Sequence, residues 1–361
     1  MECISQEKIT ALRKLIQASA RVAVAGHIHP DGDALGSTTA LALYLQEICG
    51  KEAVCLYPDS APELLSYAQH PAVRYLSPDR DPAACREAIA QADLIVVLDC
   101  NGPARTEGLQ PALEASRAPK VLIDHHLNPQ SAFFDLVFST PEISSASELL
   151  YWILQALAAG EGSPDLFART GSRSDRSGDP SPAATTIGTA LLAGMTTDTN
   201  NFANSVFPST FRMASELLAA GVDRDALLQK IYNSYRENRI RLMGYMQSQA
   251  LNILPEGAAY MILTREIQER FQLREGESEG LVNVPLAIGA VRLSLLLKED
   301  DGHFRVSLRS KKGTSAQACA QRFFHGGGHE NAAGGRLFPA DLASPEALVP
   351  YIENALKSVL S

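Results

Sequence analysis

The sequence has few of the features that mark membrane, secreted or nucleic-acid-coating proteins. No apolar run approaches the ~20 residues that span a bilayer, and residues 1–20 show an amphipathic pattern without the apolar region of a signal peptide. Positive charge is not in excess, because 32 Lys and Arg face 41 Asp and Glu, a formal net charge of −9. Sequence-blind binding of long nucleic acid depends on neutralising many phosphates. We therefore expect a cytoplasmic protein that binds neither a membrane nor long duplex DNA.

The six cysteines lack the spacing of a zinc ribbon or a redox motif. None forms a C-x-x-C pair, and several lie within apolar runs. Buried free thiols are therefore expected rather than disulfides or a zinc site. Apolar residues are plentiful, at 45% of 361 positions against 20% charged. This balance predicts a folded chain of about two domains.

The first half of the chain alternates short apolar runs with helical patterns. Strands are predicted at 21–25, 53–56, 73–76, 94–98, 121–123 and 133–137, and helices at 9–19, 35–48, 82–90 and 146–157. Such alternation is typical of βαβ units. The predicted fold class is α/β, with a mostly parallel sheet and helices on both faces.

The second half changes character twice. Gly, Ser and Pro over about 160–183 predict a flexible surface insertion. Helices are predicted again at 184–195, 209–220 and 224–232, followed by an Arg- and Gln-rich helix over 236–250. Strands at 258–263, 290–297 and 304–309 and helices at 315–324 and 345–360 then predict a smaller α+β domain. We expect an N-terminal domain over 1–235, a helical linker over 236–250 and a C-terminal domain over 251–361.

Metal-binding residue types gather where the first predicted strand gives way to a helix. His27, Asp31 and Asp33 lie in this stretch, with Gly32 between the two carboxylates. Ligands of open α/β sheets bind beyond the carboxyl ends of the strands, and imidazole and carboxylate groups hold divalent cations. We expect Gly32 to let the backbone turn sharply between the two Asp. A solvated turn is the alternative, because Pro-Asp-Gly-Asp is also ordinary turn chemistry.

Two later strand ends repeat this chemistry. Asp99 follows the strand at 94–98 directly, and Asp124-His125-His126 follows the strand at 121–123. Asp198 follows the helix at 184–195. A lone Asp can instead cap the next element. As a set, these residues suffice to hold two divalent cations, which suits phosphoester hydrolysis: His27, Asp31, Asp33, Asp99, His125 and Asp198.

The C-terminal domain offers a candidate anion site. Arg309 lies at the end of a predicted strand, and a Gly-rich loop contains Gly326-Gly327-Gly328-His329. Backbone N–H groups of glycines can approach an anion closely, and arginine pairs with phosphate. A hairpin or a tight packing corner is the alternative explanation for the glycines.

Taken together, these motifs resemble the DHH phosphoesterase family with its DHH-associated C-terminal domain. The stretch His27-x-x-x-Asp31-x-Asp33-x-x-Gly36-Ser37 is similar to the first motif, and Asp99, Asp124-His125-His126 and Asp198 match the next three. Gly326–His329 with Asn331-Ala332-Ala333-Gly334 resembles the signature of the C-terminal domain. The resemblance implies a parallel-sheet DHH domain, a smaller substrate-binding domain and an active site in the cleft between them.

The resemblance also implies roles for single residues. One Mn²⁺ would be held by His27, Asp31 and Asp99, and a second by Asp33, Asp99, His125 and Asp198, with Asp99 bridging; Mg²⁺ or Co²⁺ are alternatives. Asp124 would orient a ligand, with its partner in the neighbouring loop, and His126 would face the scissile phosphate. The far end of the substrate would be held by Arg309, Gly326, Gly327, Gly328 and His329.

Within this family, the compact layout resembles the branch that degrades short oligoribonucleotides (nanoRNA) and dephosphorylates 3′-phosphoadenosine 5′-phosphate (pAp). The implied partners are therefore short oligonucleotides or nucleotide bisphosphates, and a homodimer is compatible with the sequence. A standalone cyclic-di-AMP or pApA phosphodiesterase would use the same residues and stays open. A non-catalytic nucleotide-binding regulator stays open as well.

Overall fold

The computed structural model describes residues 3–159, 166–167 and 181–360, apart from the side chains of Leu64 and His329. The chain divides between Ser234 and Tyr235 into two compact units, which we call unit 1 and unit 2. Most of the predicted insertion, 160–165 and 168–180, lies outside the described residues. In the described part of the chain, no helix is long and apolar enough to cross a membrane.

Unit 1 contains a six-stranded parallel sheet in the order β3-β2-β1-β4-β5-β6. The strands are β1 (Arg21–Ala25), β2 (Glu52–Leu56), β3 (Arg74–Leu76), β4 (Leu94–Leu98), β5 (Lys120–Asp124) and β6 (Leu136–Ser139). The chain leaves β1 towards β2 and β3 and returns to β4 on the other side of β1. The carboxyl ends of β1 and β4 therefore flank the point where the strand order reverses, which is where open α/β sheets bind ligands.

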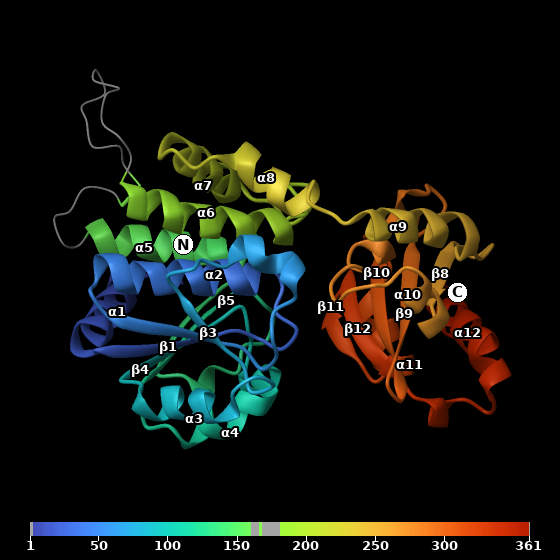
Figure 1. Cartoon of the computed structure of the whole chain (residues 1–361), viewed down its shortest axis with the longest axis horizontal. Coiled ribbons are helices and arrows are strands. Elements are labelled where there is room, and N and C mark those ends of the chain that lie inside the picture. Colours follow the sequence, from blue (N-terminus) through green and yellow to red (C-terminus); the bar gives the residue numbers. More distant parts are fainter. Residues whose placement is uncertain (1–2, 160–165, 168–180, 361) are drawn as a thin grey trace. The chain divides into compact units, whose positions relative to one another are not determined.

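Helices cover both faces of this sheet, as the alternating strands and helices predicted. Figure 1 shows α1, α2, α5 and α6 on one side and α3 and α4 on the other. Along β4, Val96 packs in the core beneath α1 and α2, whereas Ile95 and Val97 pack in the core beneath α3 and α4. The helices of unit 1 are α1 (Gln6–Ala18), α2 (Gly32–Leu43), α3 (Pro82–Gln91), α4 (Gln110–Ala115), α5 (Ala146–Ala159), α6 (Pro182–Asp198), α7 (Pro208–Ala219) and α8 (Arg224–Tyr232).

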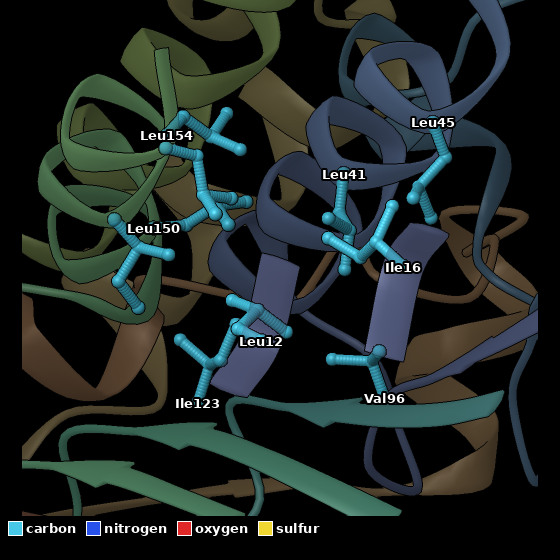
Figure 2. Close-up of a pocket in the computed structure, with 10 residues that line it drawn as sticks. Leu12, Ile16, Leu41, Leu45, Val96, Ile123, Leu150 and Leu154 are labelled. Carbon is cyan, nitrogen blue, oxygen red and sulfur yellow. The ribbon is translucent and has the colours of Figure 1, made fainter. Parts of the chain in front are cut away.

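The larger core encloses a small apolar cavity. Figure 2 shows Leu12 and Ile16 of α1 above Val96 and Ile123 of the sheet, with leucines of α2 and α5 at its sides. All these side chains are buried. Because the lining is purely apolar, the cavity cannot offer a water molecule hydrogen bonds, so it is a packing feature and not a ligand site.

Most predicted elements of unit 1 are present, with three shifts. The helix predicted at 35–48 begins earlier, at Gly32, so Asp33 is helical. Its last five residues, Tyr44–Ile48, form a π-helical turn. The strand predicted at 133–137 begins only at Leu136, because Ser131–Phe133 forms a 3₁₀ turn.

Unit 2 contains a mixed six-stranded sheet in the order β11-β12-β10-β9-β8-β7. Its strands are β7 (Asn252–Ile253), β8 (Ala258–Leu263), β9 (Leu293–Asp300), β10 (His303–Ser310), β11 (Gly327–His329) and β12 (Ala332–Leu337). Its helices are α9 (Glu237–Gln249), α10 (Arg265–Arg270), α11 (Ala316–Phe323) and α12 (Leu348–Leu360). The segment predicted as a helical linker contains α9, whose Leu242 and Met246 are buried against residues of β8 and β9 in unit 2.

The Gly-rich segment of unit 2 is not the loop that we expected. It forms β11 and β12, an antiparallel pair in which Gly327 faces Gly334 and His329 faces Ala332. A Cβ atom at Gly326 would lie 2.0 Å from the Gly334 carbonyl oxygen, and Gly328 has a φ of +135°. These two glycines therefore permit a close hairpin, which was the alternative explanation.

Candidate metal centre

The first strand end holds His27 in a defined orientation. The Nδ1 atom of His27 lies 2.7 Å from the carbonyl oxygen of Ile28, which can only accept a hydrogen bond. The proton of a neutral ring is therefore fixed on Nδ1, and the lone pair of Nε2 is free to bind a cation. Nε2 lies 3.8 Å from Asp31 Oδ2 and 3.4 Å from Asp99 Oδ2.

Asp31 and Asp33 each combine a capping contact with a place in the site. Asp31 is the N-cap of α2, because its Oδ1 accepts the backbone N–H groups of Asp33 and Ala34, both at 3.0 Å. The buried Asp33 carboxylate accepts the N–H groups of Ala146 at 2.7 Å and Ser147 at 3.0 Å, at the start of α5. Each carboxylate oxygen carries two lone pairs, so both groups retain acceptor capacity for a cation.

The prediction that Gly32 provides a sharp backbone turn between Asp31 and Asp33 is wrong. It is the first residue of α2 and does not adopt a left-handed φ. A Cβ atom at this position would lie 2.3 Å from Thr197 Oγ1. Gly32 therefore lets the start of α2 approach the end of α6, which brings Asp198 towards the strand ends.

Asp99 is at the centre of the cluster. It is buried and has a φ of +55°, a backbone conformation that is strained for a residue with a side chain. Its Oδ1 accepts no hydrogen bond, although His125 Nε2 lies 3.3 Å and His126 Nδ1 3.6 Å away. Since His27 Nε2 contacts the other oxygen, this carboxylate faces three imidazoles from two strand ends.

The third strand end contributes Asp124, His125 and His126. His125 Nε2 lies 3.5 Å from Asp198 Oδ2, so it links Asp99 to the end of α6. His126 Nδ1 lies 2.7 Å from Asp124 Oδ1. Asp124 is fully buried and its Oδ2 accepts no hydrogen bond. Its partner is thus His126 of its own loop, rather than a side chain of a neighbouring loop.

The structure adds Arg105, which the sequence analysis did not single out. Arg105 lies in the 3₁₀ segment Pro103–Leu109 after β4, and its Nη1 lies 3.0 Å from His126 Nε2. The only sequence signal was its place in the same strand-end loop as Asp99, six positions further on. A single arginine in a loop carries no distinguishing pattern.

The pKa values show a cluster with excess negative charge. Burial alone would lower the pKa of His27 and His125, but the carboxylates around them outweigh it and raise both to about 10. Burial, with repulsion from Asp99, raises the pKa of Asp198 to about 7 and that of Asp33 well above its usual range. The pKa of Asp99 is lowered despite its burial, because His125 and His27 face it.

The donor atoms fit divalent cations. Two donors at about 2.1 Å from one cation lie roughly 3.0–3.4 Å apart, according to whether the coordination is octahedral or tetrahedral. The contacts of Asp99 and Asp198 with the imidazoles, at 3.3–3.5 Å, match this spacing. Three overlapping groups bring their donor atoms within 4.8 Å of one another: His27, Asp31 and Asp99; Asp33, His125 and Asp198; Asp99, His125 and His126.

The predicted substrate residues of unit 2 lie on neighbouring strands. Arg309 of β10 and His329 of β11 both face Ala332 of β12, so the three residues form one row across the sheet. Arg309 Nη1 donates to the carbonyl oxygen of Leu308 at 2.9 Å. A Cβ atom at Gly327 would meet no atom within 4 Å, so packing does not require this glycine. The side chain of His329 lies outside the described part of the structure.

Comparison with known proteins agrees with this geometry. Residues 21–195 match the DHH family, N-terminal domain, and residues 259–348 match the DHHA1 domain. A probable bifunctional oligoribonuclease and PAP phosphatase, NrnA, of Streptococcus mutans is 29% identical over 95% of this chain and 97% of its own length. The cyclic-di-AMP phosphodiesterase GdpP of Geobacillus thermodenitrificans is 26% identical over 93% of this chain, but over only 47% of its own length.

Solved structures share the fold. An exopolyphosphatase-related protein of Bacteroides fragilis is 32% identical, covers 100% of this chain and 98% of its own, and superposes with a TM-score of 0.87. RecJ of Thermus thermophilus in complex with Mn²⁺ is 16% identical, covers 98% of this chain and 54% of its own, and has a TM-score of 0.53. These matches and the ordered acidic and imidazole residues at the strand ends show that the chain belongs to the DHH family, with an N-terminal DHH domain and a C-terminal DHHA1 domain.

Proposed function

We propose that this protein is a metal-dependent phosphoesterase that degrades short oligoribonucleotides to mononucleotides and removes the 3′-phosphate of pAp. The observation that carries the proposal is the cluster around Asp99, in which donor atoms from the loops after β1, β4 and β5 and from the end of α6 lie at the spacing of cation ligands. Relatives of matching length named oligoribonuclease and PAP phosphatase support the same substrates.

The cations we propose are two Mn²⁺ ions, one held by His27, Asp31 and Asp99 and one by Asp33, Asp99, His125 and Asp198. When bound, they would polarise the phosphoryl oxygens and supply a water acidic enough to attack at neutral pH. Asp99 lies between the two proposed sets of ligands. His27 of the first set faces one of its carboxylate oxygens, and His125 of the second set faces the other. Asp99 is therefore the residue that we assign to both cations.

The residues of the chain have distinct tasks in the hydrolysis. A bond forms between the water oxygen and phosphorus, the bond from phosphorus to the ester oxygen breaks, and the proton released by the water balances the one gained by the leaving oxygen. Asp124 accepts the Nδ1–H of His126 and so fixes the ring. We assign His126 to the side of the centre that faces the scissile phosphate, where its Nε2, the ring nitrogen that points away from Asp124, lies 3.0 Å from Arg105 Nη1.

Unit 2 supplies the candidate residues for the remainder of the substrate. Arg309 offers a cation, and at Gly327 the space that a Cβ atom would occupy is open. We include Gly326, Gly328 and His329 because they flank this position in β11 and the turn before it. The proposed ligand is a second phosphate or the sugar of a short nucleotide.

Cyclic-di-AMP or pApA hydrolysis is the second candidate, because the same residues would perform it. The length of the relatives favours the first candidate, since this chain matches less than half of the cyclic-di-AMP phosphodiesterase. A non-catalytic regulator is a poor fit to a cluster in which every expected ligand is present.

The test is a panel of initial rates with Mn²⁺ on pAp, a 5′-phosphorylated diribonucleotide, linear pApA, cyclic-di-AMP and pyrophosphate. We expect fast release from pAp and the linear dinucleotides and little from the cyclic one. A preference for cyclic-di-AMP would assign the protein to second-messenger turnover. No release from any substrate by protein with Mn²⁺ bound would refute the catalytic proposal and favour a regulator.

A further inference from the structure

Arg105 is anchored to two of the loops that build the metal centre. Its backbone carbonyl oxygen accepts the N–H of Ile28 at 2.9 Å. The carbonyl oxygen of Ile28 in turn lies 2.7 Å from His27 Nδ1. At the other end of the residue, Nη1 lies 3.0 Å from His126 Nε2. The position of Arg105 is therefore fixed by the β1 loop through its backbone and by the β5 loop through its side chain.

The contact with His126 has a defined direction. A guanidinium group can only donate hydrogen bonds and stays charged at any accessible pH. His126 Nε2 is therefore the acceptor, and its ring proton is on Nδ1, where Asp124 Oδ1 accepts it at 2.7 Å. Asp124, His126 and Arg105 form a continuous hydrogen-bonded chain from the buried core towards solvent.

The charge of Arg105 has no counter-charge in the described part of the chain. The residue is half-buried beside a group of carboxylates, yet none of them lies within 4.0 Å of its guanidinium nitrogens. Among the described residues, its side chain makes only the Nη1 contact with His126, which leaves most of its five N–H donors without an acceptor there. A partly desolvated cation in this state favours an anion, and its planar donors match two oxygens of a phosphate.

We propose that Arg105 is a catalytic residue that binds a non-bridging oxygen of the scissile phosphate. His126 and the Ile28 backbone hold the guanidinium in place before the substrate arrives, so little reorganisation is needed as negative charge develops on the phosphoryl oxygens. The ligand class is a phosphate monoester or diester. The identity of the reacting phosphate rests on the proposed function, whereas the binding of a phosphate group does not.

The first test compares Arg105→Ala and Arg105→Lys in the full-length, Mn²⁺-loaded protein. We expect kcat/KM for pAp to fall about 100- to 1,000-fold in Arg105→Ala, the range seen when one preorganised donor is removed from a developing anion. Arg105→Lys keeps the charge without the planar donors, so it should recover only part of the rate. Bound Mn²⁺ per chain should stay at the wild-type value in both variants.

A matched control is Arg117→Ala. Arg117 is exposed in the segment before β5, at the opposite end of the parallel strands from the metal centre. Its removal should leave kcat/KM unchanged. Either of two outcomes would overturn the proposal. A wild-type kcat/KM in Arg105→Ala would show that Arg105 does not act in catalysis, and loss of Mn²⁺ from that variant would show that Arg105 maintains the structure of the metal centre instead.

A binding measurement separates this proposal from the proposed function. Calorimetric titration of the wild-type protein and Arg105→Ala with inorganic phosphate, the group released from the scissile position, and with adenosine needs no turnover. We expect the Kd of inorganic phosphate to rise at least about tenfold in the variant, with the Kd of adenosine unchanged. Unchanged phosphate affinity refutes the role of Arg105 even if pAp is a substrate, and a selective loss of phosphate affinity supports it even if the whole substrate panel fails.

Discussion

At the scale of single residues, Asp99 holds the centre together. It faces His27, His125 and His126 at 3.4, 3.3 and 3.6 Å, although it belongs to neither of their loops. Its left-handed backbone and its buried Oδ1 without a hydrogen bond indicate an arrangement kept for a ligand rather than for packing.

We expect Asp99→Asn to abolish cation binding at one or both positions and to lower kcat/KM for pAp by at least about 100-fold. The amide has nearly the volume of the carboxylate, so the fold should persist. Mn²⁺ per chain, measured by elemental analysis after dialysis, checks this. Asp59→Asn is the control, since the Asp59 carboxylate accepts hydrogen bonds from the exposed His29, at 2.6 and 2.7 Å, and belongs to none of the proposed cation sites. Full Mn²⁺ content in Asp99→Asn would contradict our assignment.

The pKa values predict how cation binding depends on pH. His27 and His125 have a pKa of about 10 without a cation, so both are protonated at neutral pH. A cation needs the imidazole lone pair and therefore displaces these protons. Affinity for Mn²⁺ should rise from pH 6 to pH 8, by up to about tenfold per pH unit for each proton displaced. Calorimetry in two buffers of different ionisation enthalpy counts the protons released.

His125→Gln should release one proton fewer than the wild-type protein on Mn²⁺ binding. Equal proton release by the two proteins, or an affinity for Mn²⁺ that does not change with pH, would show that these imidazoles do not bind the cation.

Sequence could identify the candidate ligands that follow buried strands but not the residues that position them. His27 and Asp31, Asp99, and His125 lie in the turns that follow three apolar strands of one parallel sheet, so the sheet alone predicts that they lie at the same edge. Arg105 reaches His126 through a loop whose course no periodic pattern encodes. The same is true of Asp33, whose contact with the N–H groups of α5 joins residues more than a hundred positions apart.

At the scale of elements, the close approach of α2 and α6 decides where Asp198 lies. Gly32 and Gly36 face α6 with no room for a side chain, because a Cβ atom at Gly36 would lie 2.6 Å from the Ala190 carbonyl oxygen. Helical periodicity predicts both helices but not their separation, which these two glycines determine.

We expect Gly32→Ala to destabilise unit 1 by about 1–3 kcal/mol, because its methyl group overlaps Thr197. It should also weaken Mn²⁺ binding by moving Asp198. The single tryptophan of the chain, Trp152, lies in α5, so its fluorescence during urea unfolding reports on unit 1.

Gly244→Ala is the matched control in a helix. A Cβ atom at Gly244, in α9 of unit 2, would meet nothing within 4 Å. Replacement of this exposed helical glycine should stabilise unit 2 by about 0.5–1 kcal/mol, with no shift of the Trp152 transition. If both substitutions had the same effect, close helix packing at Gly32 would not be the cause.

The packing of α1 over the apolar cavity gives a further prediction. Leu12→Ala enlarges a space that is already incompletely filled, so we expect unit 1 to lose about 2–4 kcal/mol. Lys14→Ala, on the exposed side of the same helix, should change stability by less than about 0.5 kcal/mol. Urea unfolding followed by Trp152 fluorescence measures both, and similar midpoints would show that α1 is not anchored by this face.

Glycine was the main obstacle to predicting elements from sequence. The residues from Gly326 to Gly335 were expected to form a loop, yet they form β11 and β12. Strand propensity scales rank glycine low, but a Cβ atom at Gly335 would lie 2.3 Å from the Phe324 carbonyl oxygen. This hairpin therefore depends on close tertiary contacts of its backbone, which cannot be predicted from the sequence.

At the scale of the whole molecule, the proposed cation ligands and the proposed substrate-binding residues belong to different units. Every residue of the candidate metal centre belongs to unit 1. The candidate substrate residues Arg309 and His329 belong to unit 2 and form one row of its sheet with Ala332. The change of composition after residue 250 predicts two domains, because each sheet needs its own apolar core.

This division predicts a separation of kinetic effects. We expect His329→Ala to raise the KM for pAp about tenfold while Mn²⁺ per chain stays unchanged, because no proposed cation ligand lies in unit 2. Steady-state kinetics and elemental analysis measure the two quantities. Loss of Mn²⁺ from this variant would contradict the assignment of all ligands to unit 1.

The double use of Asp33 limits how this centre can be transplanted. Its carboxylate holds the first N–H groups of α5 while Asp31, two residues earlier, holds those of α2. A designer who grafted only the strand-end loops onto another scaffold would leave Asp33 without its supporting helix. The smallest portable version therefore comprises the loops and the starts of two helices, which makes it an architectural unit rather than a linear motif.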